Sequence, residues 1–229
     1  MRQLLPTLVD PVDPLAAYRD LPPAGARPAV RLNMIASLDG ATAVAGRAGG
    51  LGGRADRELF LLLRTLADVV MVAAGAVRVE GYGPADGSVP IAVVSRSCRL
   101  DWTTPFFTSA KARPIVLTVA EAPAPLRARA AEVADVVVAG EHDVDLARAL
   151  DMLAGRGLRQ VLAEGGPTLN GQLAAAGLLD ELCLTVSPLL VGGDAKRVLA
   201  GPLLAVPREL PLRSACEQDG FLFLRYRAA

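Results

Sequence analysis

Short apolar runs alternate with segments of helical periodicity along most of the chain, and this alternation limits the fold more than any other feature. The apolar runs are rich in Val, Ile, Leu and Ala, as in strands that are buried on both faces of a sheet. Between them, leucines recur at helical spacing. Strands that are joined by helices lie parallel in a sheet. We therefore predict an α/β fold with a mainly parallel central sheet and helices on both faces.

Two late apolar runs, 210–216 and 221–226, flank the turn Gln218-Asp219-Gly220. Because closely joined strands are antiparallel, we expect antiparallel C-terminal strands at one edge of the sheet. The other strands are expected at 30–36, 68–73, 91–95, 114–119, 136–138, 160–163 and 181–187. The helices are expected at 55–66, 75–82, 126–133, 146–154 and 167–176.

Residues 1–28 differ from the rest of the chain by their prolines, which stand at positions 6, 11, 14, 22, 23 and 28. This density rules out a long helix and predicts an extended arm that lies on the domain or on a partner subunit. No internal repeat or low-complexity tract follows. We predict that residues 29–229 form a single domain.

Charge and cysteine content narrow the choice of partners. The 24 Lys and Arg residues balance the 24 Asp and Glu residues, so no general attraction to nucleic acid or to anionic membranes is expected. No apolar run has the length of a membrane span, and residues 1–20 lack the pattern of a signal peptide. The chain has three cysteines, Cys98, Cys183 and Cys216, and no CxxC motif. His142 is the only histidine. We therefore expect no metal site and a cytoplasmic location.

Three junctions at the ends of apolar strands carry the chemical signals. At Glu164-Gly165-Gly166-Pro167 a strand runs into two glycines and a helix, where backbone N–H groups make an anion site. Small residues cluster in the same way at Gly75-Ala76-Val77, and Ser95-Arg96 could hold the 2′-phosphate of NADP. Each junction also has an explanation without a ligand: a tight turn for the first, core packing for the second and a surface arginine for the third. Ligands of open α/β sheets bind at the carboxyl ends of strands, so together the three predict a cofactor site.

The segment 50–55 matches the dinucleotide pattern G-x-G-x-x-A, but its context is wrong. The preceding residues 42–47 make a poor strand, and Asp68 stands at the start of its strand, so no Rossmann domain is expected. Asp39 and Glu164 are the acid–base candidates, because each follows a strand beside glycine. Alternatively, Asp39 bonds its own turn and Glu164 caps a helix.

Five segments occur in an order that resembles a known family: 36–40 (A-S-L-D-G), Leu63-Arg64 before Ala67-Asp68, 75–78 (G-A-V-R), 164–166 (E-G-G) and 188–193 (P-L-L-V-G-G). Over residues 29–227 the chain resembles the pyrimidine reductases of riboflavin biosynthesis. This RibD C-terminal-domain-like family belongs to the dihydrofolate-reductase-like superfamily. The chain looks similar in particular to stand-alone actinobacterial members.

The resemblance implies hydride transfer from NADPH to a C=N or C=O group of a pyrimidine- or pteridine-like substrate, as in 5-amino-6-(5-phosphoribosylamino)uracil reductase, by a homodimer. The alternatives are a dihydrofolate or pteridine reductase and a non-catalytic NADP-binding protein. By motif, the implied NADPH contacts are Ala36, Gly75, Ala76, Val77, Ser95, Arg96, Thr118, Gly165, Gly166, Pro167, Thr168 and Leu169. The implied substrate contacts are Asn33, Asp39, Gly50, Leu51, Gly52, Arg64 and Glu164, with Asp39 and Glu164 also the catalytic candidates.

The chain departs from the family pattern on the substrate side. Where riboflavin reductases read G-x-S-x-W-I-T, the serine, tryptophan and threonine positions hold Ala48, Gly50 and Gly52. The threonine of G-x-x-T-V is Ala76, and the segment 80–84 (E-G-Y-G-P) replaces the aspartates before a proline. Several polar groups that would hold a ribosyl phosphate are therefore missing. The resemblance thus supports the implied NADPH contacts better than the implied substrate contacts.

Overall fold

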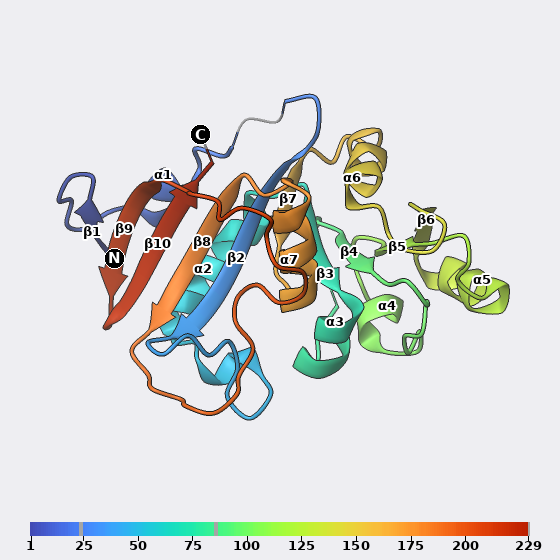
Figure 1. Ribbon diagram of the computed structural model, residues 1–229, viewed down its shortest axis with the longest axis horizontal. Coiled ribbons are helices and arrows are strands. Elements are labelled where there is room, and N and C mark those ends of the chain that lie inside the picture. The colour runs from blue at the N-terminus through green and yellow to red at the C-terminus, as the bar shows by residue number, and fades with distance from the viewer. Residues whose placement is uncertain (23–24, 85–86, 229) are drawn as a thin grey trace.

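Ten strands form one sheet in the part of the chain that the computed structural model describes, residues 1–22, 25–84 and 87–228 (Figure 1). Their order is β1-β9-β10-β8-β2-β7-β3-β4-β5-β6. The strands are β1 (Arg2–Leu5), β2 (Ala29–Ser37), β3 (Val69–Ala73), β4 (Ile91–Val94), β5 (Ile115–Thr118), β6 (Asp135–Val138), β7 (Gln160–Ala163), β8 (Glu181–Ser187), β9 (Leu212–Gln218) and β10 (Phe221–Arg227). The helices are α1 (Pro14–Tyr18), α2 (Arg54–Thr65), α3 (Ala74–Glu80), α4 (Pro105–Thr108), α5 (Ala124–Val133), α6 (Leu146–Ala154) and α7 (Pro167–Ala175), with the 3-10 turn η1 (Ala48–Gly50).

The strands from β8 to β6 along the sheet are parallel to their neighbours. Strand β10 is antiparallel to β8 and to β9, and β1 is antiparallel to β9. The predicted fold is therefore confirmed: a mainly parallel sheet with antiparallel C-terminal strands. Because parallel strands end at the same edge, the carboxyl ends of β2, β3, β4, β7 and β8 lie together.

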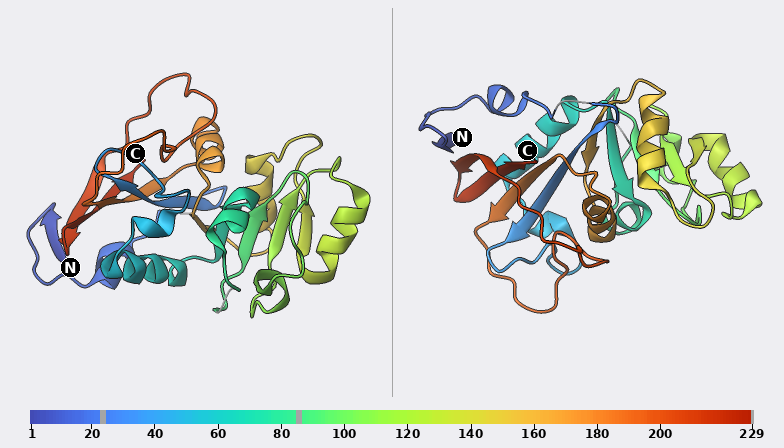
Figure 2. Two further views of the ribbon diagram at one scale, coloured as in Figure 1. Left: turned by 90° about the horizontal axis from the view of Figure 1, so that it is seen from below. Right: turned by 45° about the horizontal axis from the view of Figure 1, so that its top comes forward.

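Two apolar cores cover the two faces of the sheet, as the alternation of side chains along a strand requires. On one face, the residues of α2 such as Leu59 and Leu63 pack with Val70 and Val72 of β3. On the other face, α6 and α7 pack against residues that include Met71, the neighbour of both valines along β3. Figure 2 shows α2 below the sheet and α7 above it in the left-hand view. Helices therefore lie on both faces, as predicted.

The arm of residues 1–28 contains two elements that were not predicted, β1 and α1; residues 23 and 24 of the arm lie outside the described residues. The side chain of Asp13 accepts hydrogen bonds from the N–H groups of Leu15 and Ala16, which caps α1 at its start. Strand β1 lies at the edge of the sheet beside β9. The division into an arm and a single domain stays a prediction.

A buried cluster of charged groups joins the arm to the sheet. The Glu181 carboxylate is fully buried and accepts hydrogen bonds from Arg31, at 2.5 Å, from Arg225, at 3.0 Å, and from Arg227, at 2.8 Å. Arg225 also donates to the carboxylate of Asp20, at 2.8 Å. Burial alone would raise the pKa of Glu181, but Arg31 and Arg225 hold it below its ordinary value. This cluster fixes the end of the arm against β2, β8 and β10.

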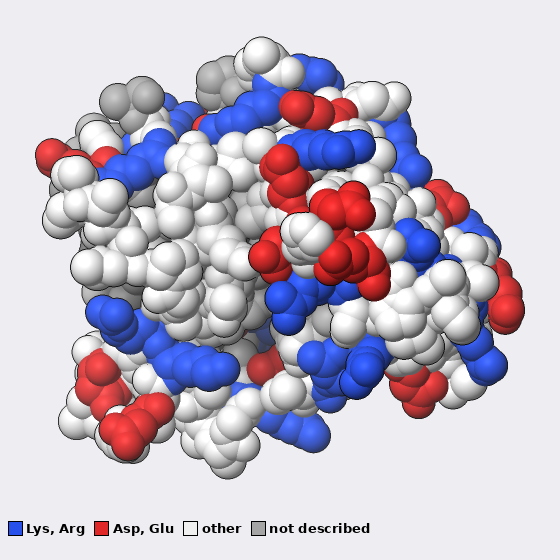
Figure 3. Space-filling model, turned by 45° about the vertical axis from the view of Figure 1, so that its right-hand side comes forward, with Lys and Arg blue, Asp and Glu red and all other residues white. Residues whose placement is uncertain are grey.

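Acidic and basic side chains are interspersed on the right of the space-filling view, and a broad uncharged area lies on the left (Figure 3). Within the described residues, no helix is long and apolar enough to cross a membrane. The same residues hold no group of three or more His, Cys, Asp or Glu side chains placed to bind a metal ion.

Candidate functional site

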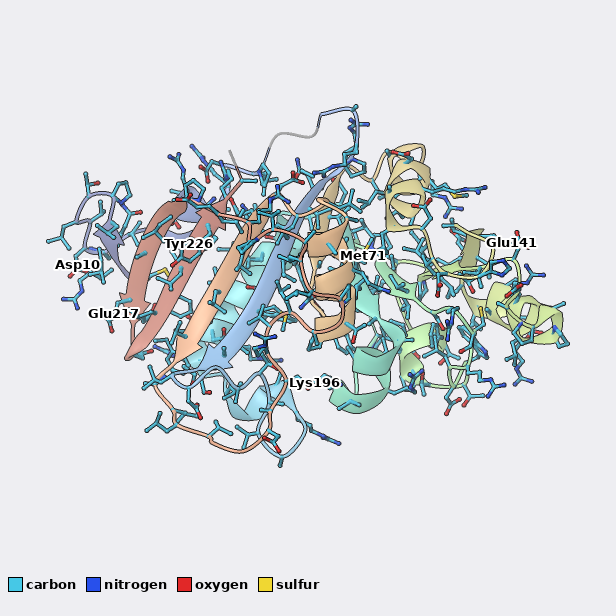
Figure 4. The ribbon with its side chains drawn as sticks, viewed as in Figure 1. Asp10, Met71, Glu141, Lys196, Glu217 and Tyr226 are labelled. Atoms are coloured by element: carbon cyan, nitrogen blue, oxygen red, sulfur yellow. The ribbon has the colours of Figure 1, made fainter. Side chains whose placement is uncertain are left out.

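The turn between β7 and α7 stands at the centre of the carboxyl edge of the sheet. The N–H of Glu164 donates to the carbonyl of Met71, at 3.0 Å, and the carbonyl of Gly165 accepts from Ala73, at 2.7 Å. In Figure 4, Met71 lies on β3 beside α7. Gly165 has a φ of +96°, a conformation that side chains rarely adopt, and the Gly165–Gly166 peptide is cis. The turn is therefore held from β3 by two backbone hydrogen bonds.

The start of α7 presents backbone N–H donors that receive no side-chain cap, as an anion site requires. Its N-cap is Gly166, which provides no side-chain hydrogen bond to the first turn, and Pro167 occupies the first helical position. The N–H groups of Thr168 and Leu169 follow there. A Cβ built on Gly166 meets no atom within 4 Å, so the space beside this turn is open. Backbone donors, the helix dipole and open space suit a phosphate group.

The next two predicted cofactor junctions lie along the same edge. A Cβ built on Gly75, in the first turn of α3 beside Ala76 and Val77, meets only the end of Arg78, at 4.0 Å. Ser95, just after β4, is buried, and Arg96 is exposed, with its guanidinium 3.2 Å from the carboxylate of Asp143. An exposed pair of this kind contributes about 0–1 kcal/mol, so Arg96 can change partners at little cost.

Five of the predicted cofactor residues are buried: Ala36, Ser95, Thr118, Gly165 and Leu169. Thr118 on β5 is fully buried, and its hydroxyl accepts a hydrogen bond from the Cys98 thiol, at 3.1 Å. Burial raises the pKa of that thiol. Ala36 on β2 is also buried. Thr118 thus contributes to packing behind the edge, and the surface available to a cofactor is made by Gly75, Gly166, Thr168 and Arg96.

On the face that α2 covers, Glu164 is held between two side chains. Arg64 donates from Nε to Oε1 at 2.8 Å and from Nη2 to Oε2 at 2.7 Å, and the Tyr82 hydroxyl donates to Oε2 at 3.2 Å. The Glu164 side chain is only 2% exposed, whereas that of Arg64 is 23% exposed. Burial, and next the Glu164 charge, raise the pKa of Tyr82. The guanidinium of Arg64 also lies over the ring of Phe60, 4.4 Å from its centroid.

Asp39 joins two loops. Its carboxylate accepts hydrogen bonds from the Ser37 hydroxyl, at 2.5 Å, and from the N–H groups of Val191, at 3.2 Å, and Gly192, at 2.6 Å. The Ser37 hydroxyl, followed by the two N–H groups, lowers the pKa of Asp39 to about 2. Asp39 therefore ties the turn after β2 to the loop after β8. That loop also contacts the segment after β2 at Lys196, whose carbonyl accepts from the Thr42 N–H and hydroxyl (Figure 4).

The glycine loop before α2, residues 46–53, is anchored through Leu51. The Leu51 side chain is buried and its carbonyl accepts from the Ser187 hydroxyl, at 2.8 Å. Glu80, at the end of α3, accepts from the N–H of Ala48, at 3.1 Å. A Cβ on Gly50 would lie 3.0 Å from Val44. The predicted substrate residues Gly50, Leu51 and Gly52 thus lie in a loop that these contacts hold in place.

One residue of this region was not predicted from the sequence. Asp56, in the first turn of α2, is half-buried, and its Oδ2 lies 2.9 Å from a Cβ built on Gly52. Burial raises the pKa of Asp56, against the effect of a hydrogen bond from Thr185 on β8. Asn33, which was predicted, lies on β2 beside Cys183 of β8, two residues before Thr185. In the sequence, Asp56 is marked only by its position one turn beyond a glycine-rich loop.

A cavity of about 230 Å³ lies elsewhere, between α1, α2 and the β9–β10 turn, and is lined by residues such as Met1, Pro14 and Leu59. It contains none of the predicted site residues. The structure therefore places Gly165, Gly166, Thr168, Gly75, Ser95 and Arg96 along one edge, with Glu164, Arg64, Asn33 and the glycine loop toward α2.

Comparisons with known proteins find relatives that match most of the chain. A model of the RibD C-terminal domain family matches residues 28–219. The 2,5-diamino-6-ribosylamino-4(3H)-pyrimidinone 5′-phosphate reductase of Methanothermobacter thermautotrophicus is 35% identical over 185 residues, covering 76% of this chain and 85% of the relative. The reductase of the same name from Archaeoglobus fulgidus is 30% identical over 192 residues, covering 76% of this chain and 87% of the relative.

A pyrimidine reductase-like protein from Corynebacterium diphtheriae has a solved structure that superposes with a TM-score of 0.78. The two chains are 25% identical, and the match covers 93% of this chain and 97% of that one. These findings confirm the resemblance read from the five motif segments and the dihydrofolate-reductase-like fold. The residues of the site are not tested by them and stay predictions.

Proposed function

The chain belongs to the RibD C-terminal domain family, and from that premise we propose that it reduces a C=N or C=O group of a ribosylamino-pyrimidine phosphate with NADPH. The observation that carries the proposal is the Glu164-Gly165-Gly166 turn. Its glutamate is held by Arg64 of α2, while Gly166 leaves open space at the start of α7. One turn thus borders two separate surfaces, as a reductase that binds a cofactor and a substrate requires.

The donor set on the α7 side fits a nicotinamide dinucleotide. We expect the N–H groups of Thr168 and Leu169 to hold the pyrophosphate, because no side chain caps them. Ser95 and Arg96 would hold the 2′-phosphate that distinguishes NADPH from NADH. The bound cofactor supplies the hydride, and the protein supplies orientation and electrostatics.

On the α2 side, Arg64 and Tyr82 hold the Glu164 carboxylate in one position, where it can orient the substrate. Asp39 has a pKa of about 2, so its carboxyl group is ionised at neutral pH and has no proton to deliver. We therefore assign Asp39 to positioning of the two loops that it joins, and proton delivery to solvent.

The glycine loop favours a second candidate substrate. The family's serine, tryptophan and threonine positions are Ala48, Gly50 and Gly52, so these three positions offer no polar side chain to a ribosyl phosphate, and Arg47 is the one polar residue among 46–53. A dihydropteridine such as dihydrofolate carries no such phosphate. A non-catalytic NADP-binding protein would bind cofactor and reduce neither compound.

NADPH oxidation measured with the ribosylamino-pyrimidine phosphates and, separately, with dihydrofolate tests these proposals. We expect turnover of a ribosylamino compound. Turnover of dihydrofolate alone would favour the second candidate, and tight NADPH binding without any turnover would favour the non-catalytic protein. A thermal-shift titration in which NADPH has no effect would contradict all three.

We also propose that the protein is a homodimer in the cytoplasm. The face of β8 and β10 opposite α2 carries no helix in the described chain, and its side chains form the apolar cross-strand pairs Leu222–Val186 and Leu224–Leu184 (Figure 1). Light scattering after gel filtration should give twice the chain mass, and Leu222→Glu should give a monomer. Leu61→Glu, at an exposed position of α2, should leave the dimer intact. The three cysteines are free, as a reducing compartment favours.

A further inference from the structure

The first half of the loop between β8 and β9, residues 189–200, forms a strap that passes the end of β2 and then crosses α7 (Figure 1). Its first part is bound to the segment after β2. The Asp39 carboxylate accepts hydrogen bonds from two N–H groups of the strap, at 3.2 and 2.6 Å. The carbonyl of Lys196 accepts from the N–H of Thr42, at 3.2 Å, and from its hydroxyl, at 2.7 Å. This part of the strap is therefore fixed on the expected substrate side.

The last part of the strap is bound to α7. Asn170 donates from Nδ2 to the carbonyl of Val198, at 2.9 Å. The N–H of Ala200 donates to the carbonyl of Pro167, also at 2.9 Å. The two segments approach so closely that a Cβ built on Gly171 would lie 2.1 Å from the carbonyl oxygen of Ala200. The strap therefore joins the expected substrate side to the start of the helix that is expected to hold the cofactor.

Two neighbouring residues of α7 that contact the strap are unfavourable for the helix and its core. Asn170 is fully buried, and its Oδ1 makes no hydrogen bond within the described chain. An unpartnered buried acceptor destabilises a protein, so a leucine of similar volume would suit this position better. Gly171 lies inside the helix without a positive φ, where alanine is more stable than glycine. The contacts with the strap explain both residues, whereas the stability of α7 does not.

We propose that Asn170 is a positioning residue that fixes the strap to α7 and so couples the binding of cofactor and substrate. This inference rests on the proposed function and specifies how its two surfaces are linked. The Asn170 amide also adjoins the cofactor turn, since a Cβ built on Gly165 would lie 3.9 Å from Nδ2.

The expected sign of the coupling follows from the two attachments of the strap. A cofactor bound at the start of α7 holds the first turn of the helix, and with it the strap. The strap in turn holds the Asp39 turn, so the second ligand meets a surface that is already ordered. Each ligand should therefore raise the affinity for the other by the same factor.

The test measures the Kd of the ribosylamino-pyrimidine phosphate by calorimetry, without cofactor and with saturating NADP⁺, which has no hydride to transfer. Wild-type protein should bind the pyrimidine about 10-fold more tightly with NADP⁺, a factor typical of coupled sites. Asn170→Leu should abolish this difference. Its Tm should stay the same or rise, because the unpartnered Oδ1 is gone, so the lost coupling would not come from lost stability.

Two further variants provide an independent check and a matched control. Gly171→Ala places a methyl group against the carbonyl of Ala200, so it should displace the strap and also reduce the coupling. Gln172→Leu makes the same kind of replacement as Asn170→Leu, but at an exposed position of α7, and should keep the full coupling.

Hydrogen exchange can follow the link through the strap itself. Val191 and Gly192 donate to Asp39 at the end of the strap away from α7. NADP⁺ should slow the exchange of their N–H groups in wild type and should have no such effect in Asn170→Leu.

The outcomes separate this inference from the proposed function. Equal affinity for the pyrimidine with and without NADP⁺ in wild type, or an unchanged ratio in both Asn170→Leu and Gly171→Ala, would overturn the role of Asn170 and leave the reductase intact. If dihydrofolate binds and the pyrimidine does not, the same ratios measured with dihydrofolate decide the inference. If wild type binds neither compound, with or without NADP⁺, both proposals are wrong.

Discussion

Arg64 and Glu164 form a two-point ion pair, with Nε–Oε1 and Nη2–Oε2 distances of 2.8 and 2.7 Å. The planar guanidinium matches both carboxylate oxygens at once, which an ammonium group cannot do. The pair joins α2 to the turn after β7, and the Glu164 side chain is almost completely buried. Arg64 therefore supplies two of the three side-chain hydrogen bonds that orient the Glu164 carboxylate, and Tyr82 supplies the third.

Arg64→Lys should keep the charge and lose this geometry. We expect kcat/KM to fall by about 10-fold or more, since the loss of a charge-assisted hydrogen bond is worth about 1.5–3 kcal/mol. Steady-state kinetics and an NADPH titration should show that the Kd for NADPH stays the same. A parallel rise in that Kd would contradict the separation of the two surfaces. Arg64→Ala should in addition destabilise the protein by on the order of 2–4 kcal/mol, because it leaves a buried carboxylate without a cation.

Gly165→Ala and Gly166→Ala form a matched pair with opposite expected effects. Gly165 has a φ of +96°, so alanine there should cost on the order of 1–2 kcal/mol in the free energy of unfolding. Gly166 has a φ of −71° and open space around its Cβ, so alanine should leave stability unchanged. That methyl group would nevertheless occupy the expected cofactor space. Urea unfolding and NADPH titration should therefore each respond to one variant and not to the other.

Arg96→Gln should lower the affinity for NADPH by about 10-fold or more and leave that for NADH unchanged, because only NADPH carries the 2′-phosphate. Fluorescence titration with both cofactors measures this ratio. An equal loss for both would assign Arg96 to another part of the cofactor. Arg99→Gln, with an exposed side chain three residues later, is the control.

Asp39→Asn should reveal a pH-dependent contribution to stability. The folded pKa of about 2 lies below the unfolded value of about 3.9, so ionised Asp39 stabilises the folded state above about pH 4. The contribution is lost as pH falls toward 2. The difference in Tm between wild type and Asp39→Asn should be largest at neutral pH and shrink below pH 4. A difference that stays constant down to pH 2 would contradict the assignment.

Glu181→Gln should destabilise the protein by about 3–5 kcal/mol, because it leaves buried guanidinium groups without their carboxylate. Glu58→Gln, at an exposed pair with Arg54, should cost less than about 1 kcal/mol. Urea unfolding of both variants provides the comparison. Similar values for the two would show that the cluster contributes little to holding the arm.

Much of the fold could be predicted because buried parallel strands and amphipathic helices leave strong local patterns. Helix α6 begins and ends at the expected residues, Leu146 and Ala154, where the side chain of Asp145 caps its start. Helix α4 has no such pattern. It is a single turn, and its Phe106 and Phe107 rings pack on each other, with centroids 4.6 Å apart, while Phe107 also packs on Trp102. Its stability comes from tertiary contacts that no local periodicity reports.

The site was predicted in part for a similar reason. Glu164 and Arg64 each stood in a recognisable motif, but their direct contact depends on how α2 crosses the sheet. Asp56 lies within a helix, so neither a strand end nor a flanking glycine marks it. Only its neighbours Gly52 and Thr185, brought together by the fold, distinguish it from a surface carboxylate.

The two edges of the sheet bear on aggregation. An exposed strand edge is a template for pairing with another chain. At one end, β1 pairs with β9, as in Arg2 with Glu217, so the long strand β9 is shielded by a short one that prolines follow. At the other end, β6 has four residues, and its Asp135 lies within ion-pair distance of Arg113 and Arg156. Short, charged and proline-flanked edge strands disfavour the addition of foreign strands, so this ten-stranded sheet is protected from growing further.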